Sequence, residues 1–262
     1  MIRVEGHFGE LVQGRLGASG PVVLVSLPCA ALAVTARLLP QAGLSIHGSG
    51  QRIISPARAR ALLQDLGIRM TGRIVLRADM PAGGGAGAST AALVAIARLA
   101  GVSDSVSIAR ACLRTEGATD PLMFPDAGRR VWASRLGKTV SNLPEIEPFD
   151  VIGGFIGAPV ATDARDARFP DVEDLIKSWT TGRLDQVAEL ATESARRTIA
   201  LRGPRHDQSE ALAKRLGARG WMIAHTGSAR GYMFPKGQTP PNAKSILRDA
   251  GYKSVVRFRG GA

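Results

Sequence analysis

A glycine-rich segment in the first half of the chain has the composition of a phosphate-binding loop. Residues 81–92 are Pro-Ala-Gly-Gly-Gly-Ala-Gly-Ala-Ser-Thr-Ala-Ala, and the apolar stretch that they enter predicts a buried helix over 89–100. Glycines let a backbone approach a ligand closely, and the free amides at the start of a helix attract an anion. Ser89 and Thr90 add hydroxyls where a phosphate oxygen or its magnesium ion would lie. The alternative is a flexible turn in which Ser89 only caps the helix, since the segment matches neither a Walker A loop nor a dinucleotide-binding loop.

Two carboxylates follow this predicted helix. Glu116 and Asp120 are four residues apart, so they would share one face if the segment were helical. One carboxylate could then hold magnesium while the other meets a substrate hydroxyl. A solvated acidic turn is the alternative for two isolated carboxylates, but their position after the glycine-rich loop favours the catalytic interpretation.

The remaining elements indicate a mixed α+β chain, because strands and helices alternate without a strict βαβ order. The irregular, proline-containing residues 138–148 indicate a boundary between halves 1–148 and 149–262. Short apolar segments bounded by glycine and proline predict strands at 2–4, 10–13, 22–27, 32–38, 73–77, 149–157 and 254–258, and segments 221–225 and 231–234 flank a small turn. Apolar periodicity predicts the other helices at 55–66, 104–113, 171–180, 184–201, 206–216 and 242–250.

Composition excludes several classes of protein. The chain has 262 residues, 45% of them hydrophobic, and only two cysteines, which excludes a disordered chain and a disulfide scaffold and indicates one or two domains in a reduced cytoplasm. The uncharged stretch 16–36 is interrupted by glycine, serine and proline, so we expect strands there and no membrane span. The net charge of +12 attracts anions in general and selects no particular partner. The basic segment 196–219 lacks aromatic residues for base stacking, so we interpret it as a solvated helical face and expect no specific nucleic acid partner.

Three segments, in order along the chain, resemble motifs of the GHMP kinases. Residues 81–91 resemble the ATP phosphate-binding loop of that family, with Ala86 and Ala88 in place of its usual Leu and first Ser. Residues 6–14, Gly-His-Phe-Gly-Glu-Leu-Val-Gln-Gly, resemble the opening motif of the bacterial L-threonine kinase branch. Residues 225–231, His-Thr-Gly-Ser-Ala-Arg-Gly, resemble the third motif, a small-residue turn beside the phosphate loop. The resemblance implies a two-lobed fold, with an N-terminal lobe like the second domain of ribosomal protein S5 and a ferredoxin-like C-terminal lobe.

The resemblance also implies a role for each motif. ATP would lie on the loop, magnesium would lie between Ser89 and Glu116, and Asp120 would take the proton of the substrate hydroxyl. The residues expected to bind the nucleotide are Pro81, Gly83, Gly84, Gly85, Ala86, Gly87, Ala88, Ser89 and Thr90. Those expected to contact or surround the substrate are Glu10, Gln13, Thr226, Gly227 and Ser228.

Two interpretations of Glu10 stay open, because it could pair with an ammonium group of an amino acid or be a buried carboxylate tied to backbone amides. We interpret His7 as structural, since a lone histidine more often is. Arg230 is either a phosphate contact or a surface arginine. Cys29 and Cys112 have no paired spacing, so we expect both in the core.

The function expected from the resemblance is transfer of the ATP γ-phosphate to L-threonine. The product would be L-threonine O-3-phosphate, used for the nucleotide-loop linker of adenosylcobalamin. Alternatives are a GHMP kinase for another small alcohol, such as homoserine or an aminoalcohol, and a nucleotide- or RNA-binding relative without catalysis. Glu116 and Asp120 together argue against the last of these.

Overall fold

The computed structural model describes residues 1–160, 163–204, 206–225 and 227–261. Thr226, one of the residues expected near the substrate, lies outside the described residues. In the described part of the chain, ten strands form one sheet and helices cover it. The strands are β1 (Ile2–Arg15), β2 (Val22–Leu39), β3 (Leu44–Ser49), β4 (Gly72–Ala78), β5 (Arg130–Ala133), β6 (Lys138–Asn142), β7 (Phe149–Phe155), β8 (Gly220–Ile223), β9 (Ala229–Pro235) and β10 (Lys253–Gly260). The helices are α1 (Pro56–Asp65), α2 (Ala88–Leu99), α3 (Ser105–Glu116), the short 3-10 helix Ala127–Arg129, α4 (Glu173–Ser178), α5 (Leu184–Arg202), α6 (Ser209–Leu216) and α7 (Ala243–Asp249).

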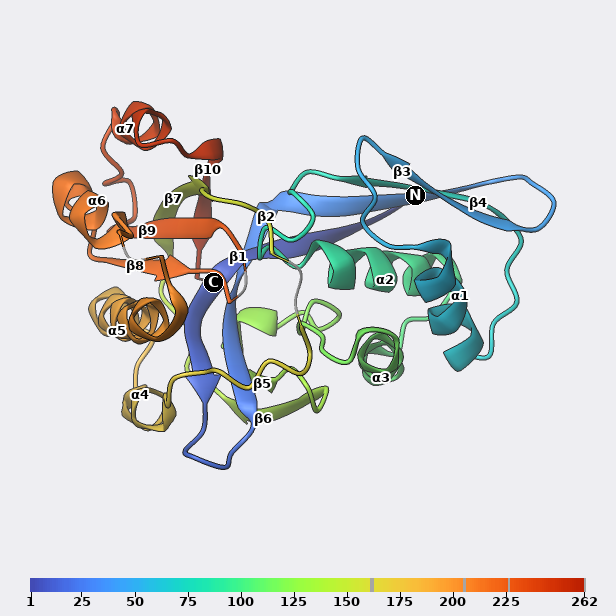
Figure 1. Cartoon of the computed structure of the whole chain (residues 1–262), viewed down its shortest axis with the longest axis horizontal. Coiled ribbons are helices and arrows are strands. Elements are labelled where there is room, and N and C mark those ends of the chain that lie inside the picture. Colours follow the sequence, from blue (N-terminus) through green and yellow to red (C-terminus); the bar gives the residue numbers. More distant parts are fainter. Residues whose placement is uncertain (161–162, 205, 226, 262) are drawn as a thin grey trace.

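The long antiparallel strands β1 and β2 run through the whole molecule. Strand order along the sheet is β10-β7-β9-β8-β1-β2-β4-β3, and the β5–β6 hairpin pairs with β2. Figure 1 shows α1, α2 and α3 grouped at one end of the long strands and α4 to α7 at the other. Both groups pack on β1, and each also packs on a strand beside it, since α2 contacts β2 while α5 contacts β8. Strand β8 joins the sheet to β1 where Ile223 pairs with Glu10.

Strands β1 and β2 are each continuous, although the sequence predicts two short strands in each. The pairing of β1 with β2 shifts register after Glu5, between His7 and Glu10, and before Val12. Such bulges keep neighbouring strands paired while they break the alternation of side chains. The alternation of apolar and polar side chains is therefore interrupted at each bulge, so the sequence indicates two strands. The hydrogen bonding between β1 and β2 nevertheless continues across the bulges.

Three short strands also differ from the sequence prediction, and of these β5 is buried whereas β3 and β6 are more exposed. Residues 138–142, predicted to be irregular, form β6, and β3 and β5 were not predicted. All but one of the side chains of β6 are exposed, and its order comes from pairing with β5. An exposed strand of this kind has no buried face, so it leaves no alternating pattern in the sequence.

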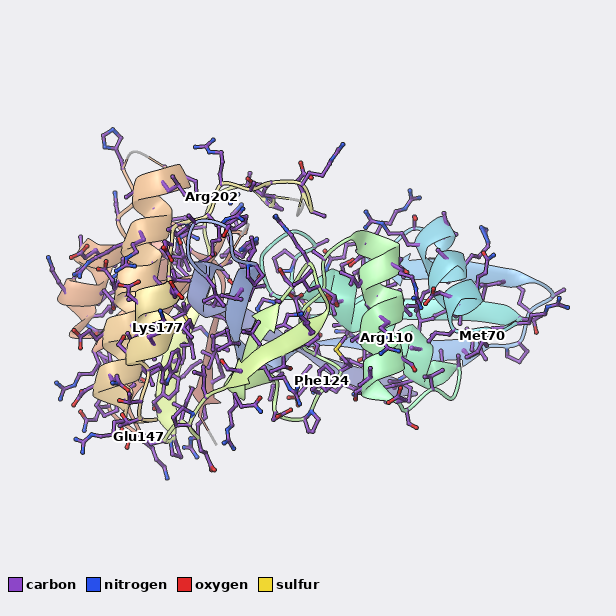
Figure 2. All side chains as sticks on the ribbon, turned by 90° about the horizontal axis from the view of Figure 1, so that it is seen from below. Met70, Arg110, Phe124, Glu147, Lys177 and Arg202 are labelled. Carbon is purple, nitrogen blue, oxygen red and sulfur yellow. The ribbon has the colours of Figure 1, made fainter. Side chains whose placement is uncertain are left out.

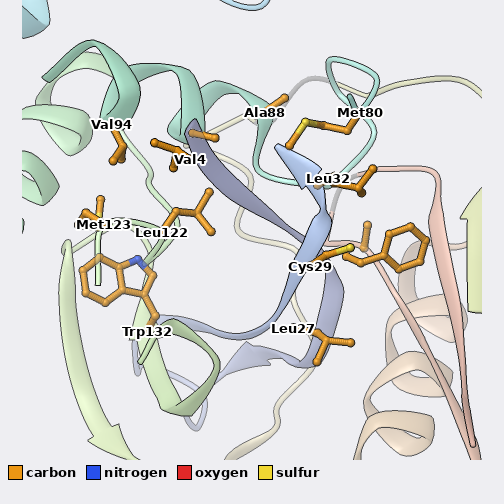
Figure 3. Packing of buried hydrophobic residues seen from close by; sticks show 14 of the residues in the cluster. Val4, Leu27, Cys29, Leu32, Met80, Ala88, Val94, Leu122, Met123 and Trp132 are labelled. Atoms are coloured by element: carbon orange, nitrogen blue, oxygen red, sulfur yellow. The ribbon is translucent and has the colours of Figure 1, made fainter. Parts of the chain in front are cut away.

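A continuous apolar core supports the glycine-rich loop from below. Figure 3 shows Met80 and Ala88, on either side of this loop, in the same cluster as Val4 and Leu32 of the central strands. Helix α2 is buried over most of its length, as predicted from its composition. Cys29 and Cys112 are free and buried, so the expectation that they are core residues is confirmed.

Charged side chains cover the outside of the helices. Figure 2 shows α5, which ends at Arg202, in one half of the molecule and α3, which carries Arg110, in the other. Arginines of α5 pair with carboxylates, since Arg196 lies 2.9 Å from Glu210 and Arg197 lies 2.7 Å from Asp174. No helix among the described residues combines the length and apolar character that crossing a bilayer requires.

Candidate active site

A cleft of about 460 Å³ lies against the glycine-rich loop. Residues from β1, the loop, α2, the segment after α3, the β5–β6 turn and the segment after β7 line it. The sequence therefore brings its motifs together at one place. The ionisable residues that line the cleft are His7, Glu10, Arg58, Glu116, Asp120, Arg135 and His225.

The glycine-rich loop holds the start of α2 open to the cleft. Gly87 is the N-cap of α2 and has a left-handed backbone with φ of 70°, and no side chain caps the helix. A Cβ at Gly87 would lie 2.7 Å from Cδ2 of His7, so only glycine fits there. The alternative role of Ser89 as a helix cap is therefore wrong. The first amides of α2 are left for an anion, which is what a phosphate site needs.

Most of the predicted loop residues line the cleft. Gly83 and the run 85–90 do so, together with Ala82, which the sequence analysis did not single out. Pro81 and Gly84 are not among the lining residues. Their role is to shape the loop, because the Pro81 carbonyl accepts the amide of Gly84 at 3.1 Å.

The third motif supports the loop from behind. A Cβ at Gly227 would lie 2.1 Å from the carbonyl carbon of Gly84, so the two backbones are in direct contact. The Gly84 carbonyl also accepts the amide of Ala229 at 3.0 Å. Neither Gly227 nor Ser228 is among the cleft-lining residues. Gly227 and Ser228 therefore lie beneath the loop, as expected for the floor of the site. They do not reach a substrate in this cleft.

Arg230 also lies away from the cleft. Its side chain is buried and lies 3.3 Å from the carboxylate of Asp207. Both earlier interpretations, a phosphate contact and a surface arginine, are therefore wrong. The burial could not be read from the sequence because it depends on the packing of α6 beside β8 and β9.

Ser89 and Glu116 form an oxygen-rich corner at the start of α2. The Ser89 hydroxyl donates to Oε1 of Glu116, and Nη1 of Arg58 lies 3.3 Å from the same oxygen. Burial raises the pKa of Glu116, although Ser89 and Arg58 oppose that effect. Magnesium in phosphate-transfer sites is held by one or two carboxylates together with substrate phosphates. These two side chains fit that pattern, and no group of three or more His, Cys, Asp or Glu in the described chain offers a metal site without phosphate.

Asp120 reaches the cleft from a loop, and the prediction of a shared helical face with Glu116 is wrong. Helix α3 ends at Glu116, and Gly117 follows in a left-handed conformation with φ of 74°, which terminates the helix. The chain then turns back over α2, where the Thr90 hydroxyl accepts the amide of Asp120 at 3.3 Å. Thr90 is buried, so it fixes the position of this loop. The two carboxylates therefore reach one cleft because the loop of Asp120 contacts α2. The four-residue spacing along a helix plays no part.

His7 lies between two carboxylates, a placement that its interpretation as a structural residue did not include. Its Nε2 is 3.6 Å from Asp120 Oδ2, and its Nδ1 is 3.6 Å from Glu10 Oε1 and 3.2 Å from the Gly9 carbonyl. Although burial lowers the pKa of His7, Asp120 and Glu10 raise it to about 9. The imidazolium in turn holds the pKa of Asp120 below its usual value against the effect of burial. Asp120 is therefore an ionised carboxylate that can accept a proton.

Both interpretations of Glu10 find support in its surroundings. Its Oε2 accepts the backbone amide of His225 at 2.6 Å, and the residue also lines the cleft. Burial raises the pKa of Glu10 to about 7. A cationic partner would stabilise the charged form of such a buried carboxylate.

Gln13 does not reach the cleft. It is buried, and its amide donates to the carbonyl of Ile223 at 3.1 Å, on the strand β8 that pairs with β1. The expectation that Gln13 contacts a substrate is therefore wrong for this cleft. Gln13 therefore links β1 to β8, a contact that a sequence motif alone does not reveal.

His225 is a functional candidate that the sequence analysis treated only as part of the third motif. Its ring stacks on Phe169 with a centroid distance of 4.5 Å, and it lines the cleft. Burial lowers the pKa of His225 to about 3, so its imidazole is neutral near pH 7. The two histidines of the cleft therefore carry different charges, His7 positive and His225 neutral.

We expect the free energy of unfolding to fall as the pH rises from about 6.5 to 9. The pKa of His7 rises from 6.5 to about 9 on folding, so its contribution is complete below pH 6.5 and is lost as the pH passes 9. The full contribution is roughly 3 kcal/mol. Urea unfolding of the protein and of His7→Asn at several pH values tests this, with the exposed His47→Asn as control. Equal pH slopes for the protein and His7→Asn would contradict it.

Comparisons with solved structures identify the fold. A phosphotransferase related to the CoA biosynthesis pathway has a TM-score of 0.66 and 15% identity and covers 99% of this chain and 96% of its own. Homoserine kinase from Cytophaga hutchinsonii gives a TM-score of 0.63 with 19% identity over 99% of this chain and 94% of its own, and a mevalonate kinase gives 0.64 with 12% identity over 100% and 99%. No protein-family model matches the sequence, and no curated protein does. The chain has the two-lobed α+β fold of the GHMP kinases, which confirms the expected fold class.

Proposed function

We propose that this protein is an ATP-dependent small-molecule kinase that phosphorylates the side-chain hydroxyl of L-threonine. The observation that carries the proposal is one cleft in which the open start of α2, the Ser89–Glu116 corner and the ionised Asp120 lie together. These are the parts that phosphoryl transfer requires, namely an anion site, oxygen ligands for a metal and a proton acceptor. The similar structures that are named kinases support the same reaction class.

The nucleotide end of the cleft is the glycine-rich loop. The free amides of α2 and the backbone of the loop bind the phosphates of ATP, and Ser89 and Glu116 would hold magnesium. Magnesium, when bound, neutralises charge on the transferred phosphoryl group. Arg58, which lies 3.3 Å from Glu116, would add a positive charge for the phosphates at this end of the cleft.

The acceptor end of the cleft is the cluster of Glu10, His7 and Asp120. The acceptor oxygen attacks the γ-phosphorus, its proton passes to the Asp120 carboxylate, and ADP leaves with the electrons of the broken phosphorus–oxygen bond. His7 fixes the orientation of Asp120 from one side, and Glu10 pairs with the ammonium group of the substrate. The product is L-threonine O-3-phosphate, which suits the synthesis of the adenosylcobalamin nucleotide-loop linker implied by the opening motif.

Homoserine is the second candidate acceptor. The similarity to the homoserine kinase of Cytophaga hutchinsonii favours it, since that enzyme has the same fold over nearly the whole chain. Homoserine carries the same ammonium and carboxylate groups and places its hydroxyl one carbon further away. The charged groups of the cleft therefore suit either amino acid.

The test is ADP release with MgATP and a panel of L-threonine, L-serine, L-homoserine and 1-amino-2-propanol. We expect the highest kcat/KM with L-threonine and no release without an acceptor. Fastest release with L-homoserine would establish the second candidate. Release with none of the four, together with RNA binding that weakens as salt rises, would contradict the kinase function and favour a nucleic acid-binding relative.

A further inference from the structure

Arg135, in the turn between β5 and β6, is a cation of the cleft that the proposed chemistry does not use. Arg58 and Arg135 are the only lysine or arginine side chains among the described residues that line the cleft. Arg58 lies at the nucleotide end, 3.3 Å from Glu116. Arg135 lies next to Phe169 and Asp166, neither of which contacts Arg58. The two cations therefore have different neighbours at the cleft.

The guanidinium of Arg135 is held in place without a carboxylate partner. It lies 5.2 Å from the centre of the Phe169 ring, and Nη2 donates to the backbone carbonyl of Asp166. The carboxylate of Asp166 lies 2.7 Å from Arg202 instead, and Arg135 forms no ion pair within the described residues. Burial and the neighbouring Arg15 and Arg202 lower the pKa of Arg135 against the pull of Asp166. An anion would relieve this excess of positive charge.

A line of contacts joins Arg135 to the buried carboxylate of Glu10. Phe169, beside Arg135, stacks on the ring of His225, and the backbone amide of His225 donates to Glu10. Nδ1 of His225 is buried and has no hydrogen-bond partner in the described chain. Arg135 and Glu10 thus lie at the two ends of this line of contacts, and the unpaired Nδ1 of His225 belongs to the residue between them.

We propose that Arg135 binds the carboxylate of the acceptor, so that the acceptor is a zwitterionic hydroxy amino acid held between Arg135 and Glu10 with its hydroxyl toward Asp120. The proposal deepens the proposed function and rests on it. In such a substrate the ammonium, carboxylate and hydroxyl groups stand on neighbouring carbons, so three complementary groups must converge on a small volume. The planar guanidinium suits a carboxylate because it donates two parallel hydrogen bonds.

The proposal separates acceptors that carry a carboxylate from those that lack it. 1-Amino-2-propanol is L-threonine without its carboxylate, and it keeps the ammonium and hydroxyl groups. A site built around a charged group rejects an analogue that lacks it, because its own charge is then left unpaired. We expect kcat/KM to be about 100-fold higher for L-threonine than for 1-amino-2-propanol.

The experiment compares Arg135→Gln with the natural protein on both acceptors. We expect the loss of kcat/KM for L-threonine to exceed the loss for 1-amino-2-propanol by about 100-fold, since only L-threonine loses an ion pair. If 1-amino-2-propanol is turned over too slowly to measure, the readout is the KM for L-threonine. It should rise far more than kcat falls in Arg135→Gln, with the KM for ATP unchanged and partial recovery in Arg135→Lys.

Arg202→Gln is the matched control. Arg202 lies 5.1 Å from the same Phe169 ring and contacts the same Asp166, but it is not among the described residues that line the cleft. We expect Arg202→Gln to change the rates with both acceptors by the same factor. Equal use of both acceptors by the natural protein, or equal losses in Arg135→Gln, would overturn the role of Arg135 and leave the kinase function intact. No ADP release with any acceptor would overturn the kinase function itself.

Discussion

Asp120→Asn is expected to lower kcat by about 10²–10⁴-fold while the affinity for ATP stays within a few-fold. The amide keeps the size of the carboxylate, but it cannot accept the proton of the acceptor hydroxyl. The affinity for ATP should persist because the proposed phosphate contacts come from the loop and the start of α2, whereas the Asp120 carboxylate lies beside His7. The measurements are steady-state ADP release with L-threonine and calorimetric titration with ATP.

Asp126→Asn is the control for this change. Asp126 belongs to the same segment after α3, but it pairs with Arg130 and is not among the described cleft residues. We expect its kcat within about two-fold of the natural value, since this ion pair lies outside the cleft. Normal turnover by Asp120→Asn would remove Asp120 from the mechanism.

The second large effect is expected for Glu116→Gln. We expect kcat/KM for ATP to fall about 100-fold or more, and the magnesium concentration at half-maximal rate to rise, because a neutral amide binds magnesium poorly. The fold should tolerate the change, since burial already raises the pKa of Glu116 and disfavours its charge. Magnesium titrations of the rate and a thermal unfolding curve measure the two effects separately.

Asp65→Asn tests whether that loss comes from the metal or from weaker packing of α1 on α3. Arg58 and Glu116 link these two helices, and Asp65 and Arg114 link them a second time at 2.7 Å. We expect Asp65→Asn to leave the magnesium dependence unchanged. A similar shift of the magnesium dependence in both variants would show that weaker helix packing causes the loss, and that Glu116 is not a magnesium ligand.

The local elements of the fold were predicted well where one residue pattern decides the structure. Helix α2 begins and ends within one residue of its prediction, because the glycines on either side of its apolar run mark both ends of the helix. The long strands β1 and β2 were divided wrongly, since their bulges interrupt the side-chain alternation but not the pairing. The exposed β6 was missed because it is ordered by pairing with β5 and its mostly exposed side chains leave no apolar pattern.

The candidate site was predicted in part. Ser89, Glu116 and Asp120 all line the cleft, as does Glu10. Their arrangement was not predicted, because Gly117 ends α3 and a loop, fixed by Thr90, carries Asp120 back to α2.

The sequence by itself determined the glycine-rich loop and the helix behind it, because both depend on residues that are neighbours in the chain. Only the tertiary structure decided that His7 lies between Glu10 and Asp120, and that Arg135 shares a wall of the cleft with His225. These residues come from β1, the loop after α3, the β5–β6 turn and the segment after β8. Charges that are distant in sequence act on one another only after the sheet has brought those segments together, so no local pattern records their interaction.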